Sequence, residues 1–150
     1  MKKIESFSII IDGFGWERQP QVTINLMQNV QVNKDSAVSF LELVVAHKID
    51  EAYAAFVDFS GKHHNAHTPA GMAALKKAME ESDVQTPTKQ LIIKNVIGED
   101  DRVAVHSRLV FESNEMAVVH IFRFNNGKIV EFWDLGMEIP ADSPNKDGAI

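Results

Sequence analysis

Apolar residues recur at the spacing of amphipathic helices in the first half of the chain and change to the spacing of strands from Lys89 onward. The first predicted helix begins at the N-cap pair Asp35-Ser36 and the second at Asp50, because each site places a capping side chain just before an apolar run. The third begins at Thr68-Pro69, where proline suits the first helical position. Residues 61–67 read as a break or a short strand.

Four β-strands are predicted after the helices, because β-rich segments there are separated by short polar turns. Helices followed by a long antiparallel meander are typical of an α+β fold. We therefore expect the helices to cover one face of an antiparallel sheet. The predicted strands span residues 91–97, 102–111, 116–124 and 128–136.

The chain has 150 residues, which suits one domain with a substantial core. Residues 1–34 are interpreted as an N-terminal arm, since Gly13, Gly15 and Pro20 interrupt their apolar pattern. The domain is expected over residues 35–140, and residues 141–150 form an irregular tail.

The last predicted hairpin, Met116 to Leu135, carries the strongest functional signal. Its loop, Asn125-Asn126-Gly127, favours a three-residue turn that pairs His120 with Phe132. His120 and Asp134 would then be diagonal neighbours on one face, about 7–8 Å apart at the backbone. The alternative is a two-residue turn, which would place His120 opposite Trp133 and send Asp134 to the other face.

An imidazole and a carboxylate on one apolar face are typical of a proton-transfer site. The low polarity of such a face strengthens the hydrogen bonds that form on it. The neighbours expected on this face are Val118, Phe122, Phe124, Val130 and Phe132.

The opposite face of these strands is also apolar, with Val119, Ile121 and Trp133. Helices can cover only one face, so a second copy of the chain is the simplest cover for the other, and we expect a homodimer. Arg123 and Glu131 could form an ion pair near the solvent edge. Ile129 is also placed on this opposite face.

Composition excludes several classes of function. The net charge of −6 and the lack of a basic cluster argue against nucleic-acid binding. The absence of cysteine excludes disulfides and thiol catalysis and is compatible with a cytoplasmic location. The apolar run Phe7 to Ile11 is too short for a signal peptide, and no segment approaches the ~20 apolar residues of a membrane span.

The segment Ile121 to Asp134, IFRFNNGKIVEFWD, resembles the SnoaL-like family, which is named for a polyketide cyclase. The family belongs to a cone-shaped α+β superfamily that also holds ketosteroid isomerase and scytalone dehydratase. His64-Asn65, Val103 to His106 and Asp142 to Gly148 are similar to further family segments. The resemblance runs over about residues 35–140. It implies a cone-shaped α+β barrel with N-terminal helices packed on a curved antiparallel sheet.

The resemblance also implies site residues. In the polyketide cyclases, the Asp of the last strand is the general acid/base for an aldol ring closure, and that role falls on Asp134. His120 matches a pocket His on the preceding strand. The chain departs from many bacterial members, which have Asp in place of His120 and His in place of Phe132. The residues expected to bind substrate are His64, Asn65, Tyr53, Phe122 and Phe132.

Two functions remain open at this stage. The first is a cofactor-independent enzyme that performs acid/base chemistry on a small apolar carbonyl compound: cyclisation, isomerisation or dehydration. The second is a non-catalytic module of the same fold that binds an apolar small molecule. A zinc site at His64, His67 and Asp134 is a weaker alternative, since spacing alone supports it and the resembling family needs no metal.

Overall fold

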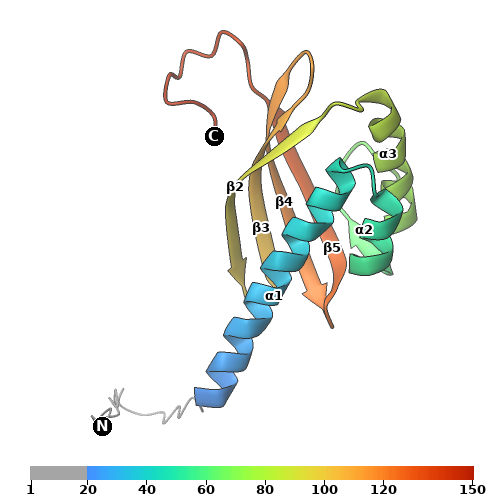
Figure 1. Ribbon diagram of the computed structural model, residues 1–150, viewed down its shortest axis with the longest axis vertical. Helices are drawn as coiled ribbons and strands as arrows, with labels where there is room; N and C mark the ends of the chain where they lie inside the picture. The colour runs from blue at the N-terminus through green and yellow to red at the C-terminus, as the bar shows by residue number, and fades with distance from the viewer. Residues whose placement is uncertain (1–19) are drawn as a thin grey trace.

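The computed structural model describes residues 20–150 as three helices packed on one five-stranded mixed sheet, an α+β cone (Figure 1). The strand order is β1-β5-β4-β3-β2, with β1 parallel to β5 and all other neighbours antiparallel. The elements are α1 Pro20–Val45, α2 Ile49–Phe56, β1 Val57–His63, α3 Met72–Gln85, β2 Gln90–Glu99, β3 Arg102–Val110, β4 Glu115–Asn125 and β5 Lys128–Glu138.

The core lies between the helices and the concave face of the sheet. Phe40 of α1 is its centre, with ring centroids 5.6 Å from Tyr53 of α2, 5.8 Å from Phe122 of β4 and 6.1 Å from Phe132 of β5. All three contacts are edge-to-face, the arrangement that aromatic rings prefer. One ring therefore fastens the long helix to the second helix and to two central strands.

The fold class was predicted correctly, but two helix starts were not. Helix α1 begins at Pro20 rather than at Asp35-Ser36, and Asp35 instead accepts a hydrogen bond from Gln31 within the helix. The extended helix packs on β2, where a Cβ at Gly98 would meet Val30 at 2.9 Å. The part of the predicted arm before Pro20 lies outside the described residues.

Helix α3 begins at Met72, with Gly71 as its N-cap, rather than at Thr68-Pro69. The Thr68 hydroxyl turns toward the side chain of Asn65 instead of capping a helix. The second helix starts at Ile49 with Lys48 as its N-cap, so Asp50 lies in the first turn and is not the cap that was predicted. The segment left open as a break or short strand belongs in part to β1, which makes the sheet mixed rather than wholly antiparallel.

The predicted pairing of the β4–β5 hairpin was wrong in detail. The turn has two residues, Asn126 and Gly127, whose φ angles of 49° and 73° are those of the type I′ turn that twisted hairpins favour. The pairing passes from Phe124↔Ile129 directly to Arg123↔Glu131, so Val130 is the extra residue of a β-bulge.

This bulge restores the side-chain alternation that the shorter turn would have reversed. His120 lies directly opposite Asp134, and both are on the concave face. Ile129, expected on the outer face, is 1% exposed in the core, while Val130, expected in the core, is only half-buried. The two predicted catalytic residues therefore do share a face, through a different register from either one considered.

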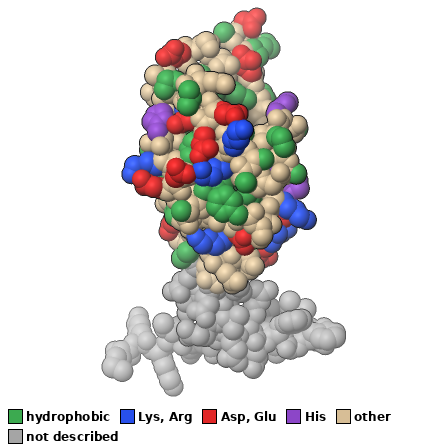
Figure 2. Space-filling view, turned by 90° about the vertical axis from the view of Figure 1, so that its right-hand side faces the viewer, with side chains coloured by type: hydrophobic (Ala, Val, Ile, Leu, Met, Phe, Trp, Pro, Cys, Tyr) green, Lys and Arg blue, Asp and Glu red, His purple; other side chains and the backbone are tan. Residues whose placement is uncertain are grey.

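No helix of the described residues 20–150 is long and apolar enough to cross a membrane. Seen from the side of α2 and α3, the surface mixes acidic and basic side chains (Figure 2). Several pair with each other there, as Lys76 does with Asp50 and Glu80.

Candidate functional site

A cavity of about 580 Å³ opens between the concave face of the sheet and the ends of α1 and α3. His120 and Asp134 are on its floor, and the loop after β1 supplies Asn65, His67 and Thr68 on one side. The rest of the lining is mostly apolar. A cavity of this size suits a small organic molecule.

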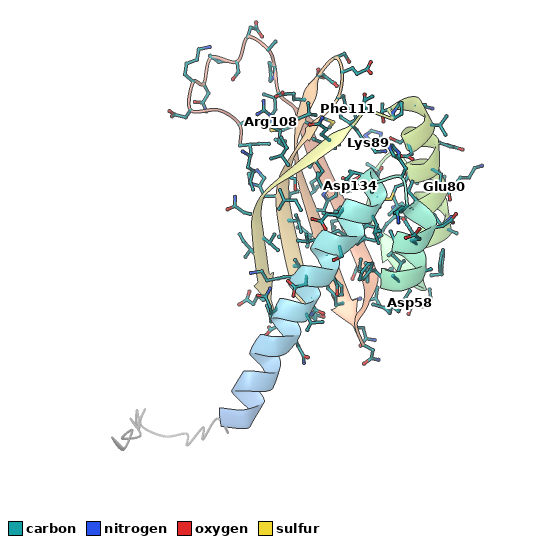
Figure 3. The ribbon with its side chains drawn as sticks, in the orientation of Figure 1. Asp58, Glu80, Lys89, Arg108, Phe111 and Asp134 are labelled. Atoms are coloured by element: carbon teal, nitrogen blue, oxygen red, sulfur yellow. The ribbon has the colours of Figure 1, made fainter. Side chains whose placement is uncertain are left out.

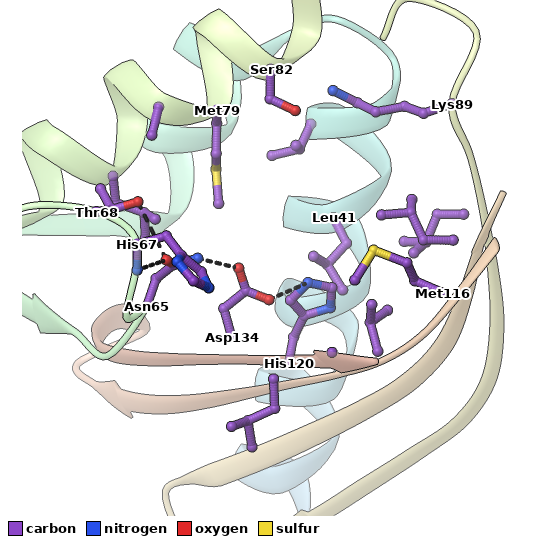
Figure 4. A pocket seen from close by; sticks show the side chains of 18 of the residues that line it. Leu41, Asn65, His67, Thr68, Met79, Ser82, Lys89, Met116, His120 and Asp134 are labelled. Atoms are coloured by element: carbon purple, nitrogen blue, oxygen red, sulfur yellow. Dashed lines mark hydrogen bonds and ion pairs between the residues drawn. The ribbon is translucent and has the colours of Figure 1, made fainter. Parts of the chain in front are cut away.

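Asp134 is held in a defined orientation by Asn65. The Asn65 side-chain oxygen accepts a hydrogen bond from the backbone N–H of His67 at 2.8 Å, which leaves its amide nitrogen as a donor (Figure 4). That nitrogen donates to Asp134 Oδ2, also at 2.8 Å. The other carboxylate oxygen, Oδ1, faces His120, and the side chain of Asp134 is 30% exposed.

His120 is the second polar group on the floor, and its Nε2 lies 3.6 Å from Asp134 Oδ1. Burial lowers the pKa of His120, while the negative charge of Asp134 opposes that shift. The imidazole is therefore neutral at pH 7. Its Nδ1 is buried without a hydrogen-bond partner among the described residues.

The unpartnered Nδ1 indicates which tautomer is present. An orphan N–H would add the penalty of a lost hydrogen bond, so the proton is better placed on Nε2. Nε2–H then points toward Asp134 and the cavity. Since 3.6 Å exceeds a normal hydrogen-bond length, this donor is available to a ligand.

The other predicted binding residues have different surroundings. Asn65 lines the cavity, but its amide nitrogen donates a hydrogen bond to Asp134, so it positions the carboxylate rather than facing a ligand directly. Tyr53, Phe122 and Phe132 are at most 1% exposed and belong to the core beneath the cavity. Burial raises the pKa of the Tyr53 hydroxyl far above its usual range, with the charge of Glu80 adding to the effect.

The ring of His64 lies on the outer face of the sheet, although the residue borders the cavity. It stacks on Trp133 with centroids 4.8 Å apart, and its Nε2 is 2.9 Å from Glu131. His64 therefore does not join His67 and Asp134 in the zinc site that was considered from the sequence. Within residues 20–150, no group of three or more His, Asp or Glu side chains is arranged to hold a metal.

Glu131 also forms, with Arg123, the ion pair that was predicted from the sequence. Arg123 Nε donates to it at 2.9 Å. Hydrogen bonds from His64 and then Arg123 lower the pKa of the Glu131 carboxyl group, against a smaller opposing effect of burial.

Lys89 was missed as a cavity residue. It comes from the segment between α3 and β2, its side chain is only 7% exposed, and its ammonium lies 2.9 Å from Asp83 Oδ1. Figure 3 shows Lys89 at the end of the molecule where the chain passes from α3 to β2. A lysine that precedes a predicted strand gives no sequence signal of burial, because lysines are normally exposed there.

Comparison with known proteins agrees with this fold. A family model described as "SnoaL-like domain" matches residues 37–132. No curated protein matches the sequence. Many solved structures do, at identities that indicate the fold alone.

Three such structures illustrate the likeness. The candidate hydroxylase AclR from Streptomyces galilaeus is 21% identical, with a TM-score of 0.62 over 71% of this chain and 79% of that one. IdmH, a candidate polyketide cyclase from Streptomyces antibioticus, is 16% identical, with a TM-score of 0.59 over 69% and 91%. A candidate ketosteroid isomerase from Kribbella flavida is 14% identical, with a TM-score of 0.64 over 81% and 90%.

Proposed function

The chain belongs to the SnoaL-like family, and from that premise we propose that it is a cofactor-independent enzyme acting on a small apolar carbonyl compound. The observation that carries the proposal is the pairing of His120 with Asp134 on the cavity floor, with Asn65 holding the carboxylate from behind. This arrangement leaves one basic oxygen and one N–H donor facing the same space.

In the proposed reaction, Asp134 Oδ1 accepts a proton from a carbon next to the substrate carbonyl. The electron pair of the broken C–H bond moves to the carbonyl oxygen, which becomes an enolate. Nε2–H of His120 donates a hydrogen bond to that oxygen as its charge develops. In an isomerisation, Asp134 then returns the proton to another carbon of the enolate system, and in a dehydration it gives the proton to a hydroxyl that leaves as water when its C–O bond breaks. In a ring closure, the enolate carbon attacks a second carbonyl carbon of the same molecule, and the proton goes to the alkoxide oxygen that this attack creates.

Each side chain is suited to its role by its surroundings. Asn65 orients Asp134 without occupying Oδ1. His120 is kept neutral by burial, so it can donate a hydrogen bond without first losing a proton to the carboxylate. The mostly apolar walls lower the local polarity, which strengthens both interactions relative to water.

The proposal is tested by exchange of the acidic C–H protons in D₂O, a reading that needs no knowledge of the product. A panel of cyclic ketones and polyketide-like compounds is first screened for binding by thermal shift. Binders are then followed by NMR with the wild type, Asp134→Asn and the exposed control Asp142→Asn. Loss of Asp134 should slow exchange by about 10²–10⁴-fold, and the control should exchange normally.

Undiminished exchange in Asp134→Asn would remove that residue from the mechanism. Tight binding of several ketones with no exchange by the wild type would favour the alternative, a module that binds an apolar molecule without transforming it. Both outcomes are read from the same samples.

We also infer a homodimer through the outer face of the sheet. Register places Ile97, Ala104, Ile121 and Trp133 in one row across four strands of that face. Val119 and Leu135 lie side by side in the next row, which continues into the polar pair His106 and Asn95. Ile97 and Leu135 are 67% and 53% exposed. A second copy of the chain would cover these apolar side chains.

A further inference from the structure

Lys89 is a charged side chain enclosed in the wall of the cavity. Its side chain is 7% exposed, and the partner found for its ammonium among the described residues is Asp83, at 2.9 Å. Asp83 is itself shared, because His47 Nδ1 approaches both of its oxygens at 2.9 Å. An ammonium can donate three hydrogen bonds, so an enclosed ammonium with one carboxylate partner still has N–H donors available to a ligand.

The cavity has a polar group at each end. Figure 4 shows Lys89 and Ser82 across the cavity from Asp134 and His120. Apolar side chains, including Leu41, Met79 and Met116, lie around the space between them. A ligand that fills this cavity therefore meets the acid/base pair at one end and an enclosed positive charge at the other.

We propose that Lys89, assisted by the hydroxyl of Ser82, binds a carboxylate at the end of the substrate remote from the carbonyl. The proposal deepens the proposed function, because it names the substrate class as an apolar keto acid. Any effect of the bound carboxylate on turnover rests on that proposed function. Charged acceptors form the stronger hydrogen bonds with an ammonium, so a carboxylate can compete with Asp83 where a neutral oxygen would not. The apolar wall makes that difference larger than it would be in water.

A simpler role for Lys89 is to tie α3 to the start of β2 through Asp83. The two roles predict opposite results when Asp83 loses its charge. If Lys89 is only a tie, Asp83→Asn weakens the local structure and does nothing for ligand acids. If Lys89 binds a carboxylate, Asp83→Asn removes a competing anion and the affinity for acids rises.

The test measures dissociation constants by calorimetry for three acids of graded length, each against its methyl ester. The probes are 4-acetylbenzoic acid, 6-acetyl-2-naphthoic acid and 4′-acetylbiphenyl-4-carboxylic acid. At least one acid should bind wild-type protein about tenfold more tightly than its ester, the usual value of a hydrogen bond to a charged group. Lys89→Met should abolish that preference without changing the affinity for the ester.

Two further variants keep the test decisive. Lys77→Met, on the exposed side of α3, should bind like the wild type. Should Lys89→Met fold poorly because Asp83 is left unpaired, the double variant Lys89→Met/Asp83→Asn removes both charges, and it too should lack the preference for acids. Asp83→Asn alone should bind the acid severalfold more tightly than the wild type.

A preference for the acid that survives in Lys89→Met or in the double variant would overturn the proposal, as would a wild type with no preference at any length. The outcome is separable from that of the proposed function. Acid preference without C–H exchange would keep the carboxylate site and refute the enzyme. C–H exchange without a preference for acids would keep the proposed enzyme and refute the carboxylate site.

Discussion

Gly61 is the position where a single added methyl group should test how the site is built. It lies in β1 beside the bulge of β5, and an ideal Cβ there would be 2.5 Å from the carbonyl oxygen of Val130 and 2.9 Å from its carbonyl carbon. Both atoms are backbone, so no side chain can turn away. The neighbouring strands would have to separate by about 0.9 Å to restore ordinary contact.

We expect Gly61→Ala to lower the free energy of unfolding by about 3 kcal/mol, since overpacking typically costs 1–3 kcal/mol and a stretched strand pair loses part of a hydrogen bond as well. For a chain of this size, that corresponds to a fall in Tm of about 6–12 °C. Urea denaturation and calorimetry measure both values.

The same substitution should impair the site, although residue 61 is not in it. The β1–β5 pairing continues through Lys62 and His63 to His64, whose backbone N–H donates to Phe132 at 2.8 Å. Asn65 follows directly and holds Asp134. A displaced β1 therefore withdraws the donor that orients the carboxylate.

Two other glycines are matched controls. A Cβ at Gly136 would meet side-chain atoms of Met116 at 3.1 Å and Val118 at 3.2 Å rather than backbone below 3.0 Å, so Gly136→Ala should cost less than Gly61→Ala, about 1 kcal/mol. Gly127 has open space around it but a φ of +73°, so Gly127→Ala should cost about 1–2 kcal/mol through backbone strain alone. A Gly61→Ala variant within about 0.5 kcal/mol of the wild type would refute the argument that the bulge requires glycine beside it.

Three further outcomes are expected. Burial lowers the pKa of His120, so the folded state binds fewer protons than the unfolded state, and the contribution of His120 to stability is present above pH 6.5 and is lost as pH falls. Urea midpoints measured at about pH 5 and pH 7.5 should therefore differ less in His120→Gln than in the wild type. Arg123→Glu would place like charges beside Glu131 and should cost at most about 1 kcal/mol of stability, with a larger loss showing that the pair also supports the strand register. The wild type should sediment as a dimer at tens of micromolar and Ile121→Lys as a monomer, and a monomeric wild type would count against the outer-face dimer.

The order of the elements was readable from the sequence because it depends on local periodicity. All four predicted strands are present to within two residues at each end, since alternating apolar residues and short polar turns determine them. The helix starts were less predictable. Asp35-Ser36 has the chemistry of a cap, but the residues before it pack on β2 at Gly98, and this tertiary contact outweighs the local signal.

The candidate site depends on a long-range feature that no local pattern revealed. Asn126-Gly127 makes the two-residue turn that, alone, would have sent Asp134 to the outer face, and the bulge at Val130 returns it to the concave face. What permits the bulge is the absence of a side chain at Gly61, far away in the sequence. The sequence therefore contains the reason for the shared face of His120 and Asp134, but in a residue whose role appears only once β1 is known to lie parallel to β5.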